Sequence, residues 1–275
     1  MNQRLMDANT IKQIGTRAAY KAGKILNEHF GHALKITKKG AIDLVTQADI
    51  ASEQIIIATI KEAFPDHAIL AEESGLANGV PDKLWVIDPL DGTTNFAHGL
   101  PLFCISIAFV YHNDITMGLV LNPVNGEFYT AVRGQGAYLK DSPIQVSSTS
   151  KVSDGLLVTG FPYDIQTTSD HIIPRFARCL KAAQGVRRLG SAALDLCFVA
   201  CGRFDGFWEE NLRLWDVAAG KLIVEEAKGR VSDYADQDYL SQLDILKPYQ
   251  SNQLLATNGT IHAEMVSLMN AKDLS

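Results

Sequence analysis

The sequence predicts a protein of mixed α and β structure, with an α+β first half and an α/β second half. Two amphipathic helical patterns open the chain, and several strand-like segments follow them in close succession. After a polar segment at 141–151, strand-like and helical segments alternate. The 275 residues suffice for one large domain or for two halves that share a core. We therefore expect an N-terminal half over 1–145 and a C-terminal half over 146–275 that form one compact unit.

Two helices are expected at the start of the chain. Hydrophobic residues recur every three or four positions between Ile11 and Ile25, which is the spacing of one helical face, and Gly31 can end this helix. A second helix is expected after Asp49, because apolar residues again share one face and Pro65-Asp66 follows them.

Short apolar segments then predict a largely antiparallel sheet. Asn125-Gly126 is typical of a tight hairpin between the last two of these strands. The strands are expected at 67–70, 84–87, 103–111, 115–121 and 127–132.

The second half has the alternating pattern of an α/β unit. Strands are expected near 155–159, 204–208, 230–232 and 253–257, and helices near 169–183, 191–201, 215–228 and 260–271.

Composition restricts the class of protein. The net charge of −6 and the pI of about 5.6 argue against generic nucleic-acid binding, although a local basic patch stays open. The longest apolar run, 102–111, is about half the length that a membrane-spanning helix needs, and the N-terminus lacks the apolar core of a signal peptide. We expect no membrane partner.

The four cysteines lie in apolar surroundings, which favours free thiols in a reducing compartment and hence a cytoplasmic protein. Cys197 and Cys201 could share a helical face toward a metal ion. No other cysteine or histidine stands nearby in the sequence, so core packing is the preferred interpretation of this pair.

The stretch WVIDPLDGTTNF at 85–96 is the strongest candidate for a site. A buried strand ends in Asp88 and Asp91, and Pro89 can bend the chain so that both carboxylates and the Leu90 carbonyl turn toward one point. Such oxygen ligands suit a hard cation, above all Mg²⁺. A helix that opens after Gly92 could offer N–H groups to a phosphate. A β-turn capped by the two Asp side chains is the alternative interpretation.

Further acidic residues stand where an ordered element meets a loop. Asp49 precedes the second helix, Glu72 follows the strand at 67–70, and Asp216 stands at the start of a later helix. Each of them alone is typical of a helix cap or a solvated charge. Together with Asp88 and Asp91, they occupy the usual places of site residues.

With these residues in view, the chain is identified as similar to a known family. The segments IDLVTQAD, ILAEES, WVIDPLDGTTNF and ENLRLWDVAAG, in this order and spacing, closely resemble those of the inositol monophosphatase family of Mg²⁺-dependent, lithium-sensitive phosphatases. The match includes 159–163 and 188–193, so that the resemblance covers nearly the whole chain. It implies a layered αβαβα sandwich of the sugar phosphatase type, and it suggests a homodimer.

The resemblance also implies roles for individual residues. Two or three Mg²⁺ ions would be bound by Glu72, Asp88, the Leu90 carbonyl and Asp91, with Asp216 joining Asp88 and Asp91 at a second ion. Thr93, held by Asp49, would position the attacking water, and Glu72 would share in catalysis.

The substrate would lie against a second set of residues. Gly92 and Thr93 would bind the phosphate through their backbone N–H groups, and Glu209 would accept a hydroxyl group. The remaining contacts would come from the loop Gly190, Ser191 and Ala192 and from Arg187 or Arg188 at the mouth. Glu210-Asn211 departs from the small or apolar residues that are usual after that Glu, which leaves the substrate preference open.

The resulting hypothesis is a phosphoric monoester hydrolase that acts on myo-inositol 1-phosphate or a related small polyol or sugar phosphate through a metal-activated water. No residue stands out as a covalent nucleophile, and no Walker-type glycine loop is present. Other activities of this enzyme class stay open, namely those on fructose 1,6-bisphosphate, histidinol phosphate, NADP and 3′-phosphoadenosine nucleotides. The rival hypothesis is a regulatory binding protein that acts through a partner in RNA synthesis.

Overall fold

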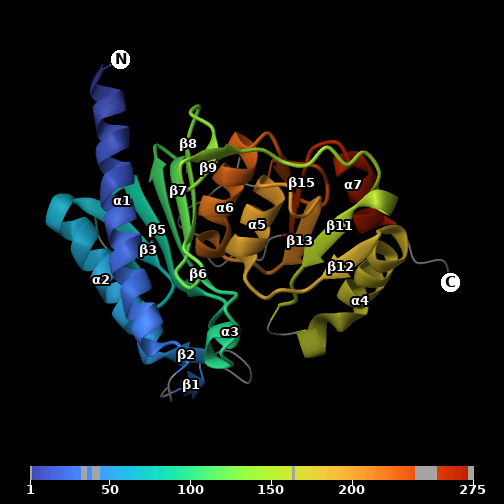
Figure 1. Cartoon of the computed structure of the whole chain (residues 1–275), viewed down its shortest axis with the longest axis horizontal. Coiled ribbons are helices and arrows are strands. Elements are labelled where there is room, and N and C mark those ends of the chain that lie inside the picture. The colour runs from blue at the N-terminus through green and yellow to red at the C-terminus, as the bar shows by residue number, and fades with distance from the viewer. Residues whose placement is uncertain are drawn as a thin grey trace.

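Alternating helices and sheets form five layers, which Figure 1 shows from left to right. The computed structural model describes residues 2–31, 36–38, 44–77, 79–162, 165–238 and 253–271. Helices cover the outer face of each of two large sheets, and two further helices lie between the sheets. The layered αβαβα prediction is therefore confirmed.

The first layer consists of α1 (Asn2–His29) and α2 (Gln47–Ala63). Their apolar faces join the outer face of the larger sheet in one hydrophobic core, which includes Ala22, Ile56 and Trp85. Helix α1 ends close to Gly31, which has a φ of +78°, as the sequence predicts. Helix α2 starts at Gln47, so Asp49 lies in its first turn and not before it.

The larger sheet has eight strands in the order β10-β9-β8-β7-β6-β5-β3-β4. Among the strands that the structure describes in this sheet, only β3 and β5 are parallel neighbours, so the prediction of a largely antiparallel sheet is confirmed. The strands are β3 (His67–Ala71), β4 (Gly75–Ala77), β5 (Val80–Asp91), β6 (Cys104–Tyr111), β7 (Asp114–Asn122), β8 (Glu127–Val132), β9 (Ala137–Leu139) and β10 (Ser142–Ile144).

The hairpin predicted at Asn125-Gly126 joins β7 to β8, and Gly126 has the positive φ of +67° that such a turn requires. Strands β4, β9 and β10 were not predicted, because three residues are too few to show an alternating pattern. A separate pair, β1 (Ile36–Lys38) and β2 (Leu44–Thr46), lies beside α3 (Thr93–Ala97).

The middle layer consists of α5 (Ala192–Ala200) and α6 (Leu214–Glu226), which are buried along nearly their whole length. Both sheets turn an apolar face toward these helices, as Val86 of the larger sheet and Phe207 of the smaller sheet illustrate. The first turns of α5 and α6 therefore lie where residues of both sheets can reach them.

The smaller sheet has five strands in the order β12-β11-β13-β15-β14. Strand β11 is parallel to β12 and β13, as expected of an α/β unit, but β15 is antiparallel to both of its neighbours. The strands are β11 (Leu156–Thr159), β12 (Gly185–Arg187), β13 (Gly206–Glu210), β14 (Arg230–Ser232) and β15 (Gln253–Thr257).

The last layer consists of α4 (Ile165–Ala182) and α7 (His262–Asn270). Within the described ranges, no helix is both long and hydrophobic enough to cross a bilayer. All four cysteines are free thiols, and Cys197 packs in the core, as predicted.

Candidate metal centre and active site

A β-bulge places Asp88 and Asp91 on the same face of the larger sheet. Asp88 is paired with Ser106 of β6 and Asp91 with Cys104, so three steps along β5 oppose two steps along β6. Without the extra residue, side chains three apart would point to opposite faces. The extra residue changes the alternation of side chains between the two faces of the sheet. Both carboxylates therefore face the layer of α5 and α6.

The parallel pairing of β3 with β5 brings Glu72 to the same place. Ala71 at the end of β3 is paired with Ile87, the residue before Asp88. The Glu72 N–H donates a hydrogen bond to the Ile87 carbonyl over 3.2 Å. Carboxyl ends of parallel neighbours meet at one edge of a sheet, which is where ligands commonly bind.

The middle helices contribute a further carboxylate and anchor another. Asp216 lies in the first turn of α6, and its Oδ2 accepts a hydrogen bond of 2.6 Å from the Arg213 N–H, as a capping residue does. Asp91 accepts hydrogen bonds from the Ser191 hydroxyl (2.6 Å) and the Ala193 N–H (2.8 Å) at the start of α5. A carboxylate from one sheet thus caps a helix that follows a strand of the other sheet.

The four carboxylates repel one another. Burial raises the pKa of Asp88 well above its usual value, and the charges of Glu72, Asp91 and Asp216 raise it further. Burial, followed by the charge of Asp91, raises the pKa of Asp216 to about 8. Burial also raises the pKa of Asp91, although the donors at the start of α5 oppose this shift. A cluster of this kind is stabilised by a bound cation.

This donor set fits Mg²⁺ in its chemistry, because it consists of carboxylates and one nearby carbonyl group. Asp88 Oδ1 accepts a hydrogen bond of 3.0 Å from the Leu90 N–H, which keeps this carboxylate folded over the bulge. Among the residues that the structure describes, no three acidic, histidine or cysteine side chains already form a closed ligand set.

Thr93 and Asp49 meet beside the cluster. The Thr93 hydroxyl lies 3.2 Å from Asp49 Oδ1 and 3.0 Å from the Leu90 carbonyl, and it can donate its proton to either oxygen. Asp49 is fully buried in the first turn of α2, and Thr93 is 7% exposed. Gly92, just before α3, has a φ of +93°, a conformation that favours glycine.

Glu209 stands near the end of β13, partly exposed, and lies against Gly160. A Cβ atom added to Gly160 would sit 2.0 Å from Glu209 Oε2, so glycine leaves the space that this carboxylate occupies. Burial, followed by the charge of Asp91, raises the pKa of Glu209 to about 8, while Arg188 opposes the shift. The structure thus brings Glu209 into the electrostatic field of the carboxylate cluster.

Asp195 is a neighbour of this site that the sequence analysis missed. It lies in α5 at 1% exposure, and neither of its carboxylate oxygens has a hydrogen-bond partner among the residues that the structure describes. Burial, then the charges of Glu209 and Asp91, raises its pKa well above the usual value. In the sequence it reads as an isolated acid within an apolar helix, so the only available signal was its place one turn after Ser191.

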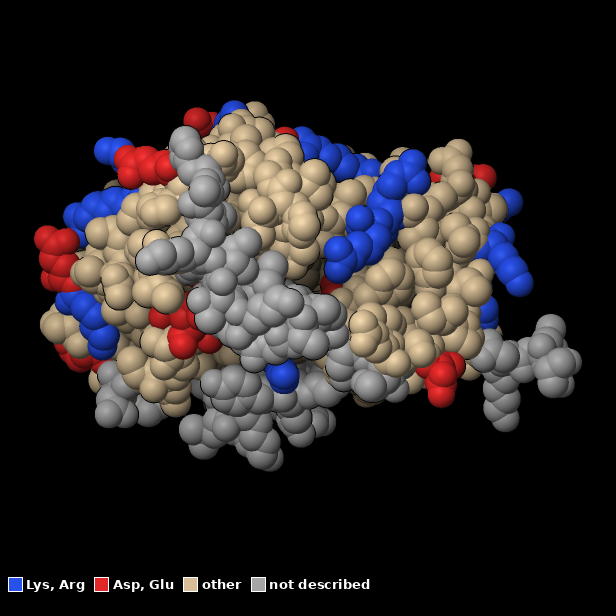
Figure 2. All heavy atoms as spheres, turned by 90° about the horizontal axis from the view of Figure 1, so that it is seen from below, with Lys and Arg blue, Asp and Glu red and all other residues tan. Residues whose placement is uncertain are grey.

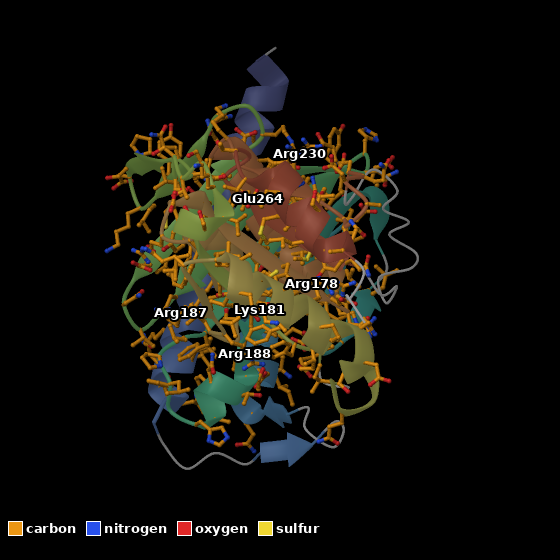
Figure 3. All side chains as sticks on the ribbon, turned by 90° about the vertical axis from the view of Figure 1, so that its right-hand side faces the viewer. Arg178, Lys181, Arg187, Arg188, Arg230 and Glu264 are labelled. Carbon is orange, nitrogen blue, oxygen red and sulfur yellow. The ribbon has the colours of Figure 1, made fainter. Side chains whose placement is uncertain are left out.

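Of the two candidate arginines, Arg188 is electrostatically coupled to the site. Its positive charge opposes the rise in the pKa values of Glu209 and Asp195. The Arg187 guanidinium instead donates a hydrogen bond of 3.1 Å to the Val186 carbonyl. Figure 2 shows a stripe of Lys and Arg atoms on the lower face of the molecule, and Figure 3 shows Arg187 and Arg188 with Lys181 in one region. Positive charge at this position attracts anions.

The loop Gly190, Ser191 and Ala192 lies directly against the turn at Gly92. The Ser191 hydroxyl, which the sequence analysis assigned to the substrate, donates to Asp91. The Ala192 N–H also lowers the pKa of that carboxylate. In this structure these two residues therefore support Asp91.

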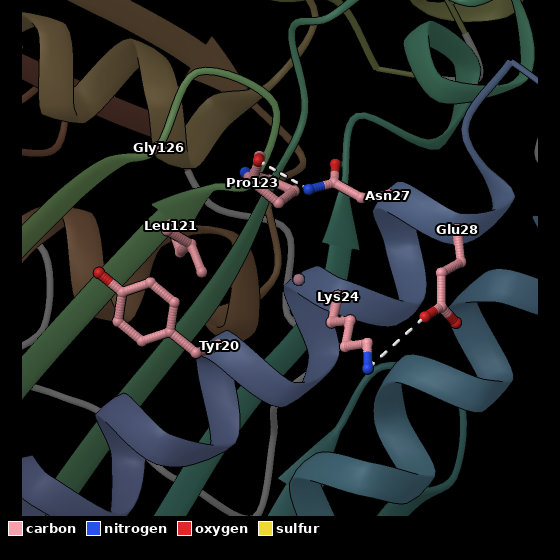
Figure 4. Close-up of a pocket in the computed structure, with 8 residues that line it drawn as sticks. Tyr20, Lys24, Asn27, Glu28, Leu121, Pro123 and Gly126 are labelled. Carbon is pink, nitrogen blue, oxygen red and sulfur yellow. Dashed lines mark hydrogen bonds and ion pairs between the residues drawn. The ribbon is translucent and has the colours of Figure 1, made fainter.

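A pocket of about 420 Å³ lies elsewhere, between α1 and the turn after β7 (Figure 4). Its walls include Tyr20, Lys24, Asn27 and Pro123, and Lys24 pairs with Glu28 at 3.9 Å. None of the predicted site residues lines it. Its position on the outer side of the sheet separates it from the carboxylate cluster.

Comparison with known proteins shows the family to which the chain is similar. The model of the inositol monophosphatase family matches residues 7–272. An inositol-1-monophosphatase of Synechocystis sp. is 47% identical over 267 residues, which cover 96% of this chain and 90% of the relative. Nus factor SuhB of Pseudomonas aeruginosa is 45% identical over 228 residues, covering 80% of this chain and 84% of that protein.

Two solved structures are similar over almost their whole length. The extragenic suppressor protein suhB of Bartonella henselae has a TM-score of 0.89 and 36% identity, with 96% of this chain and 100% of that chain covered. The inositol monophosphatase of Anabaena has a TM-score of 0.84 and 42% identity, with 96% of each chain covered.

Proposed function

The chain belongs to the inositol monophosphatase family, and on that premise we propose that it is a Mg²⁺-dependent phosphomonoesterase. Its proposed substrate is myo-inositol 1-phosphate or a related small polyol or sugar phosphate. The observation that carries the proposal is the group of four mutually repelling carboxylates, Glu72, Asp88, Asp91 and Asp216, beside the Thr93–Asp49 pair. Structural carboxylates are normally paired with cations of the protein or exposed to water.

The four carboxylates and the Leu90 carbonyl would hold two or three Mg²⁺ ions. When bound, Mg²⁺ neutralises the phosphate, lowers the pKa of a bound water and stabilises the leaving oxygen. The protein orients the water through Thr93. Because the Thr93 hydroxyl donates its proton to Asp49 or to the Leu90 carbonyl, its lone pairs can accept a hydrogen bond from the water.

Two regions of the chain would hold the substrate. The N–H groups of Gly92 and Thr93 precede the first intrahelical hydrogen bonds of α3 and are directed to the phosphate. At the other end, Glu209 accepts hydrogen bonds from substrate hydroxyls. We assign the charge at the mouth to Arg188 in preference to Arg187, because Arg188 acts on Glu209.

A panel of phosphate esters tests the function. Purified protein with MgCl₂ is assayed on inositol 1-phosphate, fructose 1,6-bisphosphate, histidinol phosphate, NADP and 3′-phosphoadenosine nucleotide, with EDTA as the control. Among these esters we expect the highest kcat/KM on inositol 1-phosphate, and we expect no release of phosphate in EDTA. A preference for one of the other esters would replace the substrate assignment, and release of phosphate from no ester would contradict the enzymatic proposal.

A second candidate function is that of a regulatory protein with a partner in RNA synthesis. It is favoured by the relative that carries the name Nus factor SuhB. The net charge of −6 gives it no general attraction for nucleic acid, so a protein partner is the better candidate. Activity on the ester panel would establish catalysis and leave this role as an additional one.

We also propose that the protein is a homodimer in the cytoplasm and that lithium inhibits it. The free thiols support a reducing compartment. Light scattering during size-exclusion chromatography tests the dimer, and a mass that matches one chain of 30.0 kDa would contradict it.

A further inference from the structure

Two short segments are hydrogen-bonded to each other at two points beside the carboxylate cluster. The first segment, 91–95, runs from the last residue of β5 into α3, and the second, 189–193, runs from the loop after β12 into α5. At one end of this contact, the first segment supplies the acceptor. Asp91 Oδ2 receives hydrogen bonds from the Ser191 hydroxyl at 2.6 Å and from the Ala193 N–H at 2.8 Å.

At the other end, the first segment supplies the donor, and Asn95 is the residue responsible. Its amide nitrogen lies 2.8 Å from the Leu189 carbonyl, 3.3 Å from the Gly190 carbonyl and 2.7 Å from the Leu102 carbonyl. The two amide hydrogens thus serve the loop at 189–190 and the chain before β6. Because Asn95 is only 5% exposed, water cannot readily replace it as a donor.

Between these two points, two glycines allow the backbones of the segments to approach each other closely. A Cβ atom added to Gly92 would lie 2.9 Å from the Leu102 carbonyl oxygen and 3.3 Å from that of Gly190. A Cβ atom added to Gly190 would lie 3.2 Å from the Asn95 amide nitrogen. Both glycines have positive φ, +93° and +88°. Hydrogen bonds of Asp91 and Asn95 therefore hold the two segments together at this close approach.

We propose that Asn95 is a positioning residue that selects substrates by the span between their phosphate and their ring hydroxyls. The inference rests on the proposed function, in which the turn at Gly92 binds the phosphate, and on the expectation from the sequence that the loop at 190–192 lies along the substrate. Asn95 would contact neither the phosphate nor the ring hydroxyls of the substrate. It fixes the distance between the two regions, and reactions with bound substrates are sensitive to displacements of about 1 Å.

The test compares Asn95→Asp with wild type. Aspartate has the same shape but replaces the donor with an oxygen that the three carbonyls repel. The matched control is Asn258→Asp. Asn258 is also 5% exposed, and its amide nitrogen donates to the Thr149 carbonyl at 2.8 Å, far along the chain from the site. Where Asn95→Asp does not fold, Asn95→Ala removes the donor without adding a charge.

Three measurements are made on each protein. For inositol 1-phosphate, we expect KM to rise about tenfold in Asn95→Asp with kcat within about twofold, a loss equivalent to about one hydrogen bond. For p-nitrophenyl phosphate, which lacks ring hydroxyls, we expect both constants to stay within about twofold. Hydrogen exchange of the amides at 189–193 should be faster in Asn95→Asp and unchanged in Asn258→Asp.

The outcomes separate the inference from the function. An equal loss on both substrates would overturn the inference, because Asn95 would then support the carboxylate cluster. Unchanged kinetics or unchanged hydrogen exchange would also overturn it. Failure of the wild type to hydrolyse inositol 1-phosphate would count against the proposed substrate alone, and the same comparison would then use the polyol or sugar phosphate with the highest kcat/KM. Failure on every ester would overturn both.

Discussion

The Thr93 hydroxyl lies 3.2 Å from Asp49 Oδ1, and the contact joins the residue after the Gly92 turn to the first turn of α2. Both side chains are buried. The threonine proton is therefore donated to Asp49 or to the Leu90 carbonyl, which leaves the hydroxyl lone pairs for the proposed water. We expect Thr93→Val, which removes the hydroxyl and nearly keeps the shape, to lower kcat by about 10²- to 10³-fold, in the range of positioned proton-transfer groups.

Thr93→Ser is the matched control, since it retains the hydroxyl. It should keep kcat within about tenfold of the wild type, the difference that about 1.4 kcal/mol makes. Steady-state kinetics with inositol 1-phosphate at saturating MgCl₂ measures both variants. Equal rates for Thr93→Val and the wild type would remove Thr93 from the catalytic group.

Asp91→Asn should abolish most of the activity while the fold persists. The carboxylate is a proposed metal ligand, and without it two cations would lack a compensating charge, so we expect a loss of several orders of magnitude. The carbonyl oxygen of asparagine can still accept the bonds from Ser191 and Ala193. Activity and thermal melting are measured together in MgCl₂ and in EDTA. Turnover close to that of wild type at saturating MgCl₂ would contradict the assignment.

Without metal, the protein should become less stable as the pH rises from 7 to 9. Burial raises the pKa values of Asp216 and Glu209 to about 8 in the folded protein, against ordinary values of 3.8 and 4.5. Folding thus favours their protonated forms, and this preference stabilises the folded protein. The stabilisation is fully present below the unfolded pKa values and is lost as the pH rises through the folded pKa values. Mg²⁺ should oppose the loss, because it binds the ionised form of Asp216.

Thermal melting in EDTA and in MgCl₂ across this range measures the effect. Asp216→Asn is the control, and its melting temperature in EDTA should depend less on pH. A melting temperature in EDTA that rises with pH in the wild type would contradict the expected sign.

Lithium should inhibit the enzyme more than potassium does at equal ionic strength. Li⁺ resembles Mg²⁺ in size but carries half its charge, so it can enter an oxygen site without supporting turnover. Rates are compared in LiCl and KCl at matched concentrations, so that screening of surface charge is the same. Equal effects of both salts would count against a site of the inositol monophosphatase type.

Glu209→Gln should discriminate between substrates. The assay is made at about pH 9, above the raised pKa of about 8, where Glu209 is ionised. An ionised acceptor of a hydroxyl group is worth about 1.5–3 kcal/mol, so kcat/KM for inositol 1-phosphate should fall about 10- to 150-fold. The rate on p-nitrophenyl phosphate should hardly change. An equal loss on both substrates would mean that Glu209 supports the carboxylate cluster.

Gly160→Ala offers an independent approach to the same carboxylate. Its Cβ would lie 2.0 Å from Glu209 Oε2, so the side chain must move. We therefore expect this variant to show the same preference for p-nitrophenyl phosphate as Glu209→Gln. Unchanged kcat/KM for inositol 1-phosphate would show that the position of Glu209 is unimportant.

The sequence revealed those parts of the site that are adjacent along the chain. Asp88 and Asp91 share a stretch with Gly92 and Thr93, and a motif records such spacing. The sequence did not reveal the β-bulge in β5, because the extra residue is defined only by the pairing of Asp88 with Ser106 and of Asp91 with Cys104. Local patterns carry no information on pairing register.

Residues that act across the two sheets were harder to find. Asn95 reads as a polar residue after the motif, and its role depends on the carbonyl groups of Leu189 and Gly190. Asp195 reads as one acid in an apolar helix, and its neighbours Glu209 and Asp91 are brought to it only by folding. Asp43 and Tyr163, both part of segments that the sequence analysis used, lie outside the described residues.

The capping of α5 by Asp91 has a consequence for the order in which the molecule folds. Each sheet can acquire its strands from nearby chain, whereas this cap joins residues separated by about 100 positions. Contacts between residues so distant in sequence form late, since the intervening chain loses entropy before they are made. We therefore expect a refolding intermediate that contains native-like sheets but no competent centre. In stopped-flow refolding, far-ultraviolet circular dichroism should recover before enzymatic activity does.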